Sequence, residues 1–298
     1  MFLIAATGPA LAQNTDDALE GLKIPGIANY APSTRTIPLN NQAIAGELLL
    51  DAKLSAEGEP ITDGLKWRIY SSEPSLADGT LPLIATAEGG GARFLLEPGD
   101  YLVHAAFGRA GATTRIMLTQ EPRNATLVLN AGGLLLDATL PNGVEAKTAR
   151  LSFDIHSIDE TTGEQTLVLP GVAANHTVRL PAGTYHVISK YGGYNAEIRA
   201  DLRVEAGKTT QATIEHRAAS VAFELVRQEG GAPLADTAWS ILSPTGEIIL
   251  EHAGPRPSAI LASGTYTVVA ENRDRVYQKE VTVTAGRDLN IELLTSEN

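Results

Sequence analysis

The side chains best suited to metal or acid–base chemistry in this sequence of 298 residues are six histidines, scattered at positions 104, 156, 176, 186, 216 and 252. Asp154 and His156 are two residues apart, so on a strand both side chains point to the same face. An oxygen and a nitrogen ligand together could bind a metal ion, but an ordinary exposed polar face has the same pattern. We favour the polar face and expect neither a bound metal nor a cofactor.

No catalytic motif accompanies these histidines. The sequence contains no Gly-x-Ser-x-Gly nucleophile turn, no P-loop, no dinucleotide-binding glycine motif between a strand and a helix, and no His-Glu-x-x-His. Because cysteine is absent, disulfides, thiolate metal sites and cysteine nucleophiles are excluded. The sequence therefore predicts a protein that is not an enzyme. A metal-dependent enzyme built around Asp154 and His156 is kept as an alternative.

Recognition chemistry is concentrated at three expected hairpin tips, where aromatic and cationic residues gather. The chain as a whole has only 5% aromatic residues and a net charge of -12, so these tips stand out. Loops that carry aromatic and arginine side chains are common binding surfaces. The candidate partner-binding residues are Phe107, Arg109, Tyr191, Tyr194, Arg273, Arg275 and Tyr277. The alternative is that each aromatic ring covers its own core while glycine makes the turn tight.

An internal repeat determines which elements hold these tips. The first repeated motif is Leu-x-x-Gly-x-Tyr, which ends at Tyr101, Tyr185 and Tyr266. The second is aromatic-x-Ile-x-Ser, which begins at Trp67, Phe153 and Trp239. Two motifs in the same order predict three tandem copies of about 80–90 residues each. We place them at residues 44–130, 131–217 and 218–298.

Each copy is expected to form about seven short strands. Apolar and polar residues alternate with period two in these segments, and turn residues separate them. The one helical candidate is short, at residues 15–22. The predicted fold class is therefore all-β, with three tandem immunoglobulin-like or transthyretin-like antiparallel β-sandwich domains.

The Leu-x-x-Gly-x-Tyr motif predicts a tyrosine corner in each sandwich. The chain crosses from one sheet to the other at the glycine, the ring enters the core, and the hydroxyl bonds to the upstream backbone. A residue that recurs in every copy is a structural anchor rather than a catalytic tyrosine. The predicted structural residues are Trp67, Tyr101, Phe153, Tyr185, Trp239 and Tyr266.

A further element precedes the aromatic strand in copies one and three, at residues 58–63 and 231–236, and has the pattern Gly-x-Pro-[Ile/Leu]-x-Asp. With the corner motif it resembles the carboxypeptidase-regulatory-like and transthyretin-like sandwich families. Val281, Val283 and Gly286 are also similar to PEGA-type repeats of bacterial exported proteins. The resemblance implies non-catalytic accessory modules that bind glycans or partner proteins. Copy two lacks the proline element.

The start of the chain indicates export. Residues 1–12 are uncharged, mostly apolar and end in Ala-Leu-Ala, so we interpret them as a signal-peptide remnant; a frayed apolar terminus is the alternative. Residues 13–43 are expected to be a linker with a candidate short strand at 36–40. With no cysteine, the expected location is the bacterial periplasm or cell surface.

The expected partner is an envelope protein or a glycan. The acidic balance disfavours nucleic acid, and no apolar run approaches the roughly 18 residues that span a bilayer. The predicted function is a binding or spacer module for envelope proteins. A carbohydrate-binding accessory module is the alternative.

Overall fold

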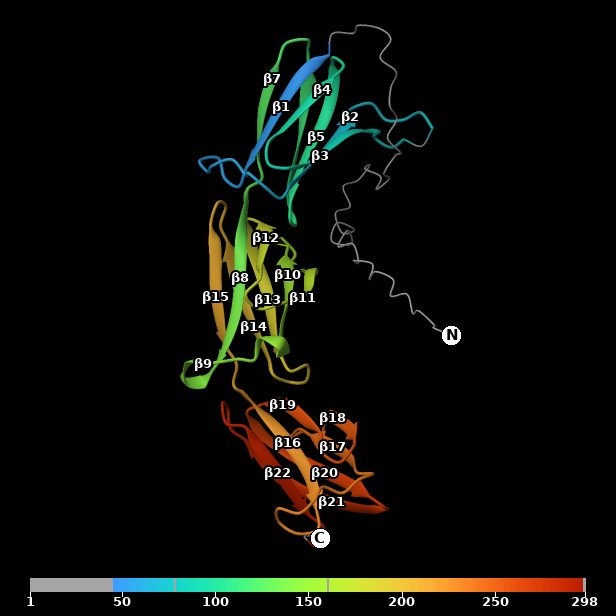
Figure 1. Ribbon diagram of the computed structural model, residues 1–298, viewed down its shortest axis with the longest axis vertical. Helices are drawn as coiled ribbons and strands as arrows, with labels where there is room; N and C mark the ends of the chain where they lie inside the picture. Colours follow the sequence, from blue (N-terminus) through green and yellow to red (C-terminus); the bar gives the residue numbers. More distant parts are fainter. Residues whose placement is uncertain (1–44, 78, 160, 297–298) are drawn as a thin grey trace, which may run out of the picture. The chain divides into compact units, whose positions relative to one another are not determined.

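The computed structural model describes residues 45–77, 79–159 and 161–296 of the chain (Figure 1). The predicted signal remnant, the linker and the helical candidate lie outside these residues. The described residues divide into two compact units. Unit 1 consists of β1, up to Lys53, together with residues 59–129. Unit 2 consists of residues 54–58 and the chain from Asn130 onward.

Unit 1 is one β-sandwich, called sandwich 1. Its strands are β1 (Gly46–Lys53), β2 (Leu65–Ser71), β3 (Leu83–Gly89), β4 (Ala92–Leu96), β5 (Gly99–Phe107), β6 (Ala110–Leu118) and β7 (Arg123–Val128). They form a three-stranded sheet of order β4-β1-β7 and a four-stranded sheet of order β3-β2-β5-β6.

Unit 2 contains sandwiches 2 and 3, which repeat this pattern. Sandwich 2 consists of β8 (Ala131–Leu140), β9 (Val144–Glu145), β10 (Leu151–Ile158), β11 (Gln165–Val172), β12 (Thr177–Pro181), β13 (Gly183–Tyr191), β14 (Glu197–Val204) and β15 (Thr209–Glu215). Sandwich 3 consists of β16 (Ala218–Val226), β17 (Ala238–Leu242), β18 (Ile248–Ala253), β19 (Ser258–Ala262), β20 (Gly264–Asn272), β21 (Arg275–Val283) and β22 (Leu289–Leu294). Their sheets are β12-β8-β15 with β11-β10-β13-β14, and β19-β16-β22 with β18-β17-β20-β21.

The predicted all-β fold with three tandem sandwiches is confirmed, while the exact domain boundaries stay a prediction.

One feature of the sheets differs from a purely antiparallel pattern. The first and last strands of each sandwich pair in parallel, as β1 with β7, β8 with β15, and β16 with β22. A parallel last strand ends at the opposite end of the sandwich from where the chain entered. The chain can therefore start the next sandwich with almost no linker, as between Glu215 and Ala218 in unit 2.

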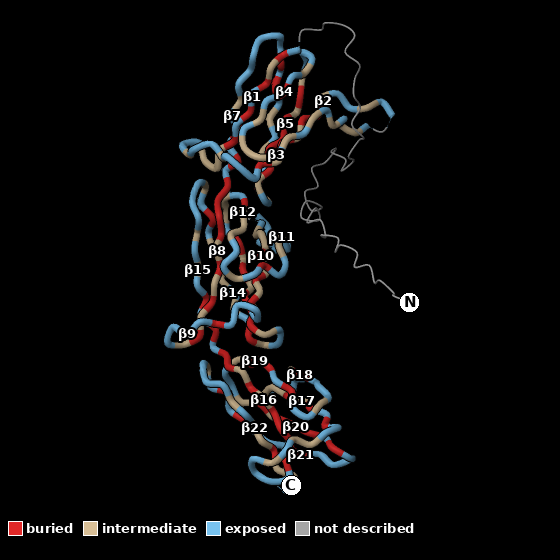
Figure 2. Tube along the Cα trace, in the orientation of Figure 1, coloured by how far each residue is buried: buried red, intermediate tan, exposed pale blue. Residues whose placement is uncertain are grey.

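The cores follow from the alternation of side chains along the strands (Figure 2). Trp67, Phe153 and Trp239 are almost completely buried. Both tryptophans satisfy their indole N–H, because Trp67 donates to the Gly90 carbonyl at 2.8 Å and Trp239 to the Gly254 carbonyl at 2.9 Å. Phe153 fills the same place in sandwich 2 and has no such donor to satisfy.

Candidate functional site: tyrosine corners and hairpin tips

A tyrosine corner stands at the start of the central strand in each sandwich. Tyr101, Tyr185 and Tyr266 are all buried. Each hydroxyl donates to the carbonyl four residues upstream, at 2.8 Å to Glu97, 2.9 Å to Pro181 and 2.8 Å to Ala262. Each ring therefore closes the crossing between the two sheets of its own sandwich.

Burial keeps the hydroxyls of Tyr101 and Tyr185 protonated. Removal from water raises the pKa of Tyr185 to about 12. The pKa of Tyr101 is also raised, first by burial and then by the negative charge of Glu97. Both side chains therefore remain hydrogen-bond donors at neutral pH, as the corner requires.

At the opposite end of each central strand lies a hairpin tip, and the predicted contact residues there divide into buried and exposed groups. Tyr191 and Tyr277 have exposed fractions of only 3% and 6%. The Tyr191 ring lies 5.7 Å from the His216 ring, centroid to centroid, and Tyr277 belongs to the core of sandwich 3. Neither ring offers an exposed contact surface, which agrees with the alternative that such rings cover their own cores.

Phe107 is half-buried at the tip of sandwich 1. A Cβ atom on Gly64 would lie 2.8 Å from the Phe107 ring, and Gly64 has a φ of 80°. The close approach of the ring therefore depends on a glycine there. Phe107 thus packs onto its own sandwich rather than projecting from the tip.

The exposed group consists of Tyr194, Arg273 and Arg275, with Arg109 intermediate. Within the residues that the structure describes, neither Arg273 nor Arg275 forms an ion pair. Arg273 and Asp274 make the two-residue turn between β20 and β21, and both have positive φ angles, of 48° and 62°. Glycine or asparagine would adopt this left-handed geometry with less strain. Strained backbone positions are concentrated at functional sites, so the strain at Arg273 makes this exposed tip a candidate contact site.

The tip of sandwich 2 contacts the corner of sandwich 3 within unit 2. The Asn195 side-chain amide donates to the Tyr266 hydroxyl at 2.7 Å, and its oxygen accepts from the Ala262 N–H at 3.1 Å. Beside it, a Cβ atom on Gly192 would lie 2.5 Å from the Ile260 Cβ. Ile260 is 7% exposed and belongs to the core cluster of sandwich 2, although it lies on β19 of sandwich 3. Tip and corner therefore form one continuous, packed joint.

Sequence reasoning missed Asn195. The residue follows the glycine-rich tip and precedes β14, and nothing in its neighbours marks it as different from an ordinary turn asparagine. A polar residue at the same place in each hairpin tip could have indicated a contact with the next corner. The three tips differ in sequence, so the sequence does not provide this signal.

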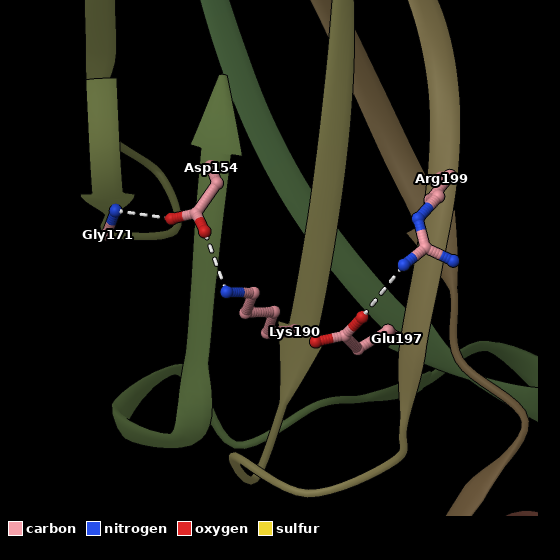
Figure 3. A network of polar contacts seen from close by, with 5 residues as sticks. All are labelled: Asp154, Gly171, Lys190, Glu197 and Arg199. Carbon is pink, nitrogen blue, oxygen red and sulfur yellow. Dashed lines mark hydrogen bonds and ion pairs between the residues drawn. The ribbon is translucent and has the colours of Figure 1, made fainter. Parts of the chain in front are cut away.

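Asp154 and His156 of the predicted polar face alternate along β10 with its buried residues. Figure 3 shows Asp154 with its partners Gly171 and Lys190. Asp154 pairs with Lys190 at 2.7 Å and accepts from the Gly171 N–H at 2.8 Å, so both carboxylate oxygens are engaged. Burial alone would raise the pKa of Asp154, but the hydrogen bonds from Lys190 and Gly171 outweigh it and lower that pKa. Nearby, Glu197 pairs with Arg199 at 3.4 Å.

The histidines of this face do not complete a ligand set. His156 is the cross-strand neighbour of His186, and the His186 Nδ1 lies 2.7 Å from an Asp201 carboxylate oxygen. Over the described part of the chain, no group of three or more histidine, aspartate or glutamate side chains is placed to hold a metal ion. The arrangement matches a polar sheet face held by cross-strand pairs.

One serine–histidine pair was not singled out by sequence reasoning. The Ser189 hydroxyl lies 2.7 Å from the His216 Nε2, and both residues are almost completely buried. Burial lowers the pKa of His216, so the ring is neutral. Because no solvent reaches either group, the pair supports the core near the joint and is closed to a substrate.

The fold and these contacts define a tandem-repeat β-sandwich protein. Residues 220–295, in sandwich 3, match the Rhizobiales growth-associated tandem repeat domain. A comparison with curated proteins gives no match. The resemblance to carboxypeptidase-regulatory-like and PEGA-type families is not among these matches and stays a prediction.

Several solved structures are similar to the chain at low identity. The Bacillus anthracis TIE protein is 13% identical over 84% of this chain and 51% of that protein, with a TM-score of 0.24, so the chain spans about half of its length. The minor pilin of Streptococcus agalactiae is 16% identical over 58% of this chain and 95% of the pilin, with a TM-score of 0.30. A streptococcal ancillary pilin is 13% identical over 84% of this chain and 98% of the pilin, with a TM-score of 0.30. The assignment of the fold rests on the six sheets of this chain itself.

Within the described ranges, no helix has the length and apolar character needed to cross a membrane.

Proposed function

We propose that this chain is an exported, non-enzymatic spacer and binding protein of the bacterial envelope. In this proposal the sandwiches hold exposed hairpin tips at defined positions, and the tips contact partner proteins. The periplasm or the cell surface is the proposed location, as expected from the apolar residues 1–12 and the absence of cysteine.

The observation that carries the spacer role is the bridge from Asn195 to Tyr266 and Ala262. Flexible linkers between domains leave their relative positions free, whereas a packed joint with two side-chain hydrogen bonds restricts them. The parallel pairing of first and last strands supports the same role, because it carries the chain forward from one sandwich to the next.

The binding role is supported by the exposed cations of the third tip. Arg273 and Arg275 stand on a chain with a net charge of -12, and both are exposed. The tip carries two exposed arginines against one exposed aspartate, Asp274, and this excess positive charge favours an acidic protein surface as its partner. Glycan binding is less well supported, because sugar recognition uses exposed aromatic faces and Tyr194, at 40% exposed, is the single exposed aromatic ring among the predicted tip residues.

A capture experiment with matched variants tests the binding role. The full chain is immobilised, and proteins retained from an envelope extract are quantified and then re-tested as purified proteins. The variant Arg273→Glu/Arg275→Glu is expected to lose the retained partner. Arg203→Glu, an exposed strand arginine away from the tips, is the control and is expected to keep it. Equal retention by all three chains would contradict the proposal.

A further inference from the structure

The corner of sandwich 3 acts as a receptor for a hairpin tip. Two groups of this corner bind the Asn195 side chain, namely the Ala262 N–H and the Tyr266 hydroxyl. Ala262 ends β19, an edge strand of its sheet, so its N–H is available to a group that arrives from outside the sheet. The receptor therefore consists of an edge N–H beside a tyrosine hydroxyl.

Sandwich 1 presents the same two groups at the same positions of its motif. Glu97 corresponds to Ala262 and follows β4, which is again an edge strand, and Tyr101 corresponds to Tyr266. Among the residues described for unit 1, nothing accepts a hydrogen bond from the Glu97 N–H. Sandwich 2 differs, because Pro181 stands at this position and has no N–H. Sandwich 1 thus keeps the receptor chemistry that sandwich 3 uses.

A pocket of about 1160 Å³ opens at this corner of sandwich 1. Tyr101 lines it, together with the apolar side chains of Ile84 and Met117, which are 47% and 65% exposed. The charged side chains that line it are all acidic: Glu73, Glu97, Asp100 and Glu121. Asp100 is paired with Arg115 at 3.0 Å, while no ion pair involves the other three within unit 1 as described. The pocket therefore favours a basic occupant.

The tip of sandwich 3 has the matching properties. It is a narrow two-residue turn with Arg273 and Arg275 exposed on either side of Asp274. In the part of unit 2 that is described, no carboxylate pairs with either arginine. Guanidinium groups can donate to several carboxylates and to a tyrosine hydroxyl at once.

We propose that the corner of sandwich 1 binds the β20–β21 tip of a second copy of this chain, so that copies associate end to end. The contact would resemble the tip-to-corner joint between sandwiches 2 and 3, with an arginine donating to the Tyr101 hydroxyl as the Asn195 amide donates to Tyr266, and with carboxylates added around the tyrosine. Because a guanidinium group has no acceptor, a main-chain carbonyl of the turn would accept from the Glu97 N–H, in place of the Asn195 oxygen that accepts from Ala262. The inference rests on the proposed binding role of the tips and names their partner as another copy.

Sedimentation velocity of the full chain over a range of concentrations and salt tests this inference. The wild-type chain is expected to associate as its concentration rises, and added salt is expected to weaken the association because the contact is between exposed charges. Arg273→Glu/Arg275→Glu and Glu97→Arg/Glu121→Arg are each expected to weaken self-association at least about tenfold. Arg203→Glu is the control and is expected to associate as the wild type does.

Mixing the two charge-reversed chains gives the decisive measurement. One chain then has an acidic tip and the other a basic corner, so the contact is complementary again and association is expected to return. The inference is wrong if the mixture stays monomeric, or if the wild-type chain is monomeric at every concentration. These outcomes would leave capture of a different protein by the arginine tip intact, so they separate this inference from the proposed function.

Discussion

The side-chain amide of Asn195 lies 2.7 Å from the hydroxyl of Tyr266, although the two residues belong to different sandwiches. That hydroxyl already donates to the Ala262 carbonyl, so it serves as donor within its own sandwich and as acceptor toward the neighbour. A tyrosine that anchors one core thus also fixes the position of the adjoining tip. The stability of sandwich 3 and the geometry of the joint are therefore linked through one oxygen atom.

Replacing Asn195 with alanine should weaken the joint. The change removes both side-chain hydrogen bonds and leaves the Ala262 N–H without its acceptor, so we expect a loss of about 1–3 kcal/mol in the free energy of unfolding of unit 2. Chemical denaturation and faster amide exchange at Ala262 measure it. Asn195→Asp keeps an acceptor for the Ala262 N–H but no donor for Tyr266, so its effect should be intermediate. If amide exchange at Ala262 is unchanged in the alanine variant, the Asn195 hydrogen bonds do not stabilise the joint.

The corner tyrosines Tyr101 and Tyr266 should differ in their sensitivity to loss of the hydroxyl. Tyr101→Phe removes one bond to a carbonyl, whereas Tyr266→Phe also leaves the Asn195 amide without its acceptor. Each change should cost about 1–3 kcal/mol, with the larger value for Tyr266→Phe. Urea unfolding of both single variants provides the comparison. Equal costs would mean that the bond across the joint adds nothing.

Substitutions at two adjacent glycines can distinguish the cost of backbone strain from the cost of crowding at the joint. Gly192 and Gly193 have φ angles of 90° and 86°, but a Cβ atom would lie 2.5 Å from Ile260 at the first and meet nothing within 4 Å at the second. Gly193→Ala should cost roughly 1–2 kcal/mol from its left-handed backbone alone. Gly192→Ala should cost about 1–3 kcal/mol more, because Ile260 must move. Thermal unfolding of the pair measures the difference, which should vanish if the joint is absent in solution.

Unit 2 should lose stability as the pH falls below neutrality. Burial lowers the pKa of His216 from its ordinary value of 6.5, so the folded state binds this proton less readily than the unfolded state does. The stability that unit 2 has with a neutral His216 is fully present above the unfolded pKa of about 6.5. It is lost as the pH falls from that value toward the lower pKa of the folded state. His216→Asn should reduce the dependence, measured as denaturation midpoints of unit 2 between pH 7.5 and 5. A variant with the same slope as the wild-type chain would exclude His216 as the cause.

Arg273 should be a residue that costs stability. Its left-handed backbone is strained by roughly 1–2 kcal/mol relative to glycine, so Arg273→Gly should stabilise sandwich 3 while it weakens tip binding. Asp274→Gly relieves similar strain and keeps both arginines, so it should stabilise without loss of binding. Denaturation midpoints and sedimentation velocity together provide the readout. Binding that survives Arg273→Gly in full would remove this arginine from the contact.

The amino-acid sequence by itself determined the number of sandwiches, the strand class and the place of each corner tyrosine. These features depend on local information, namely alternation with period two, turn residues and a motif whose tyrosine bonds only four residues upstream. The tertiary structure alone decided that Tyr191 and Tyr277 are buried, that first and last strands pair in parallel, and that Asn195 bridges to a corner 71 positions away in the sequence. Burial of a ring at a hairpin tip depends on which neighbour covers it, and a contact between sandwiches depends on how two complete folds pack together. Neither is encoded in the spacing of residues along one strand.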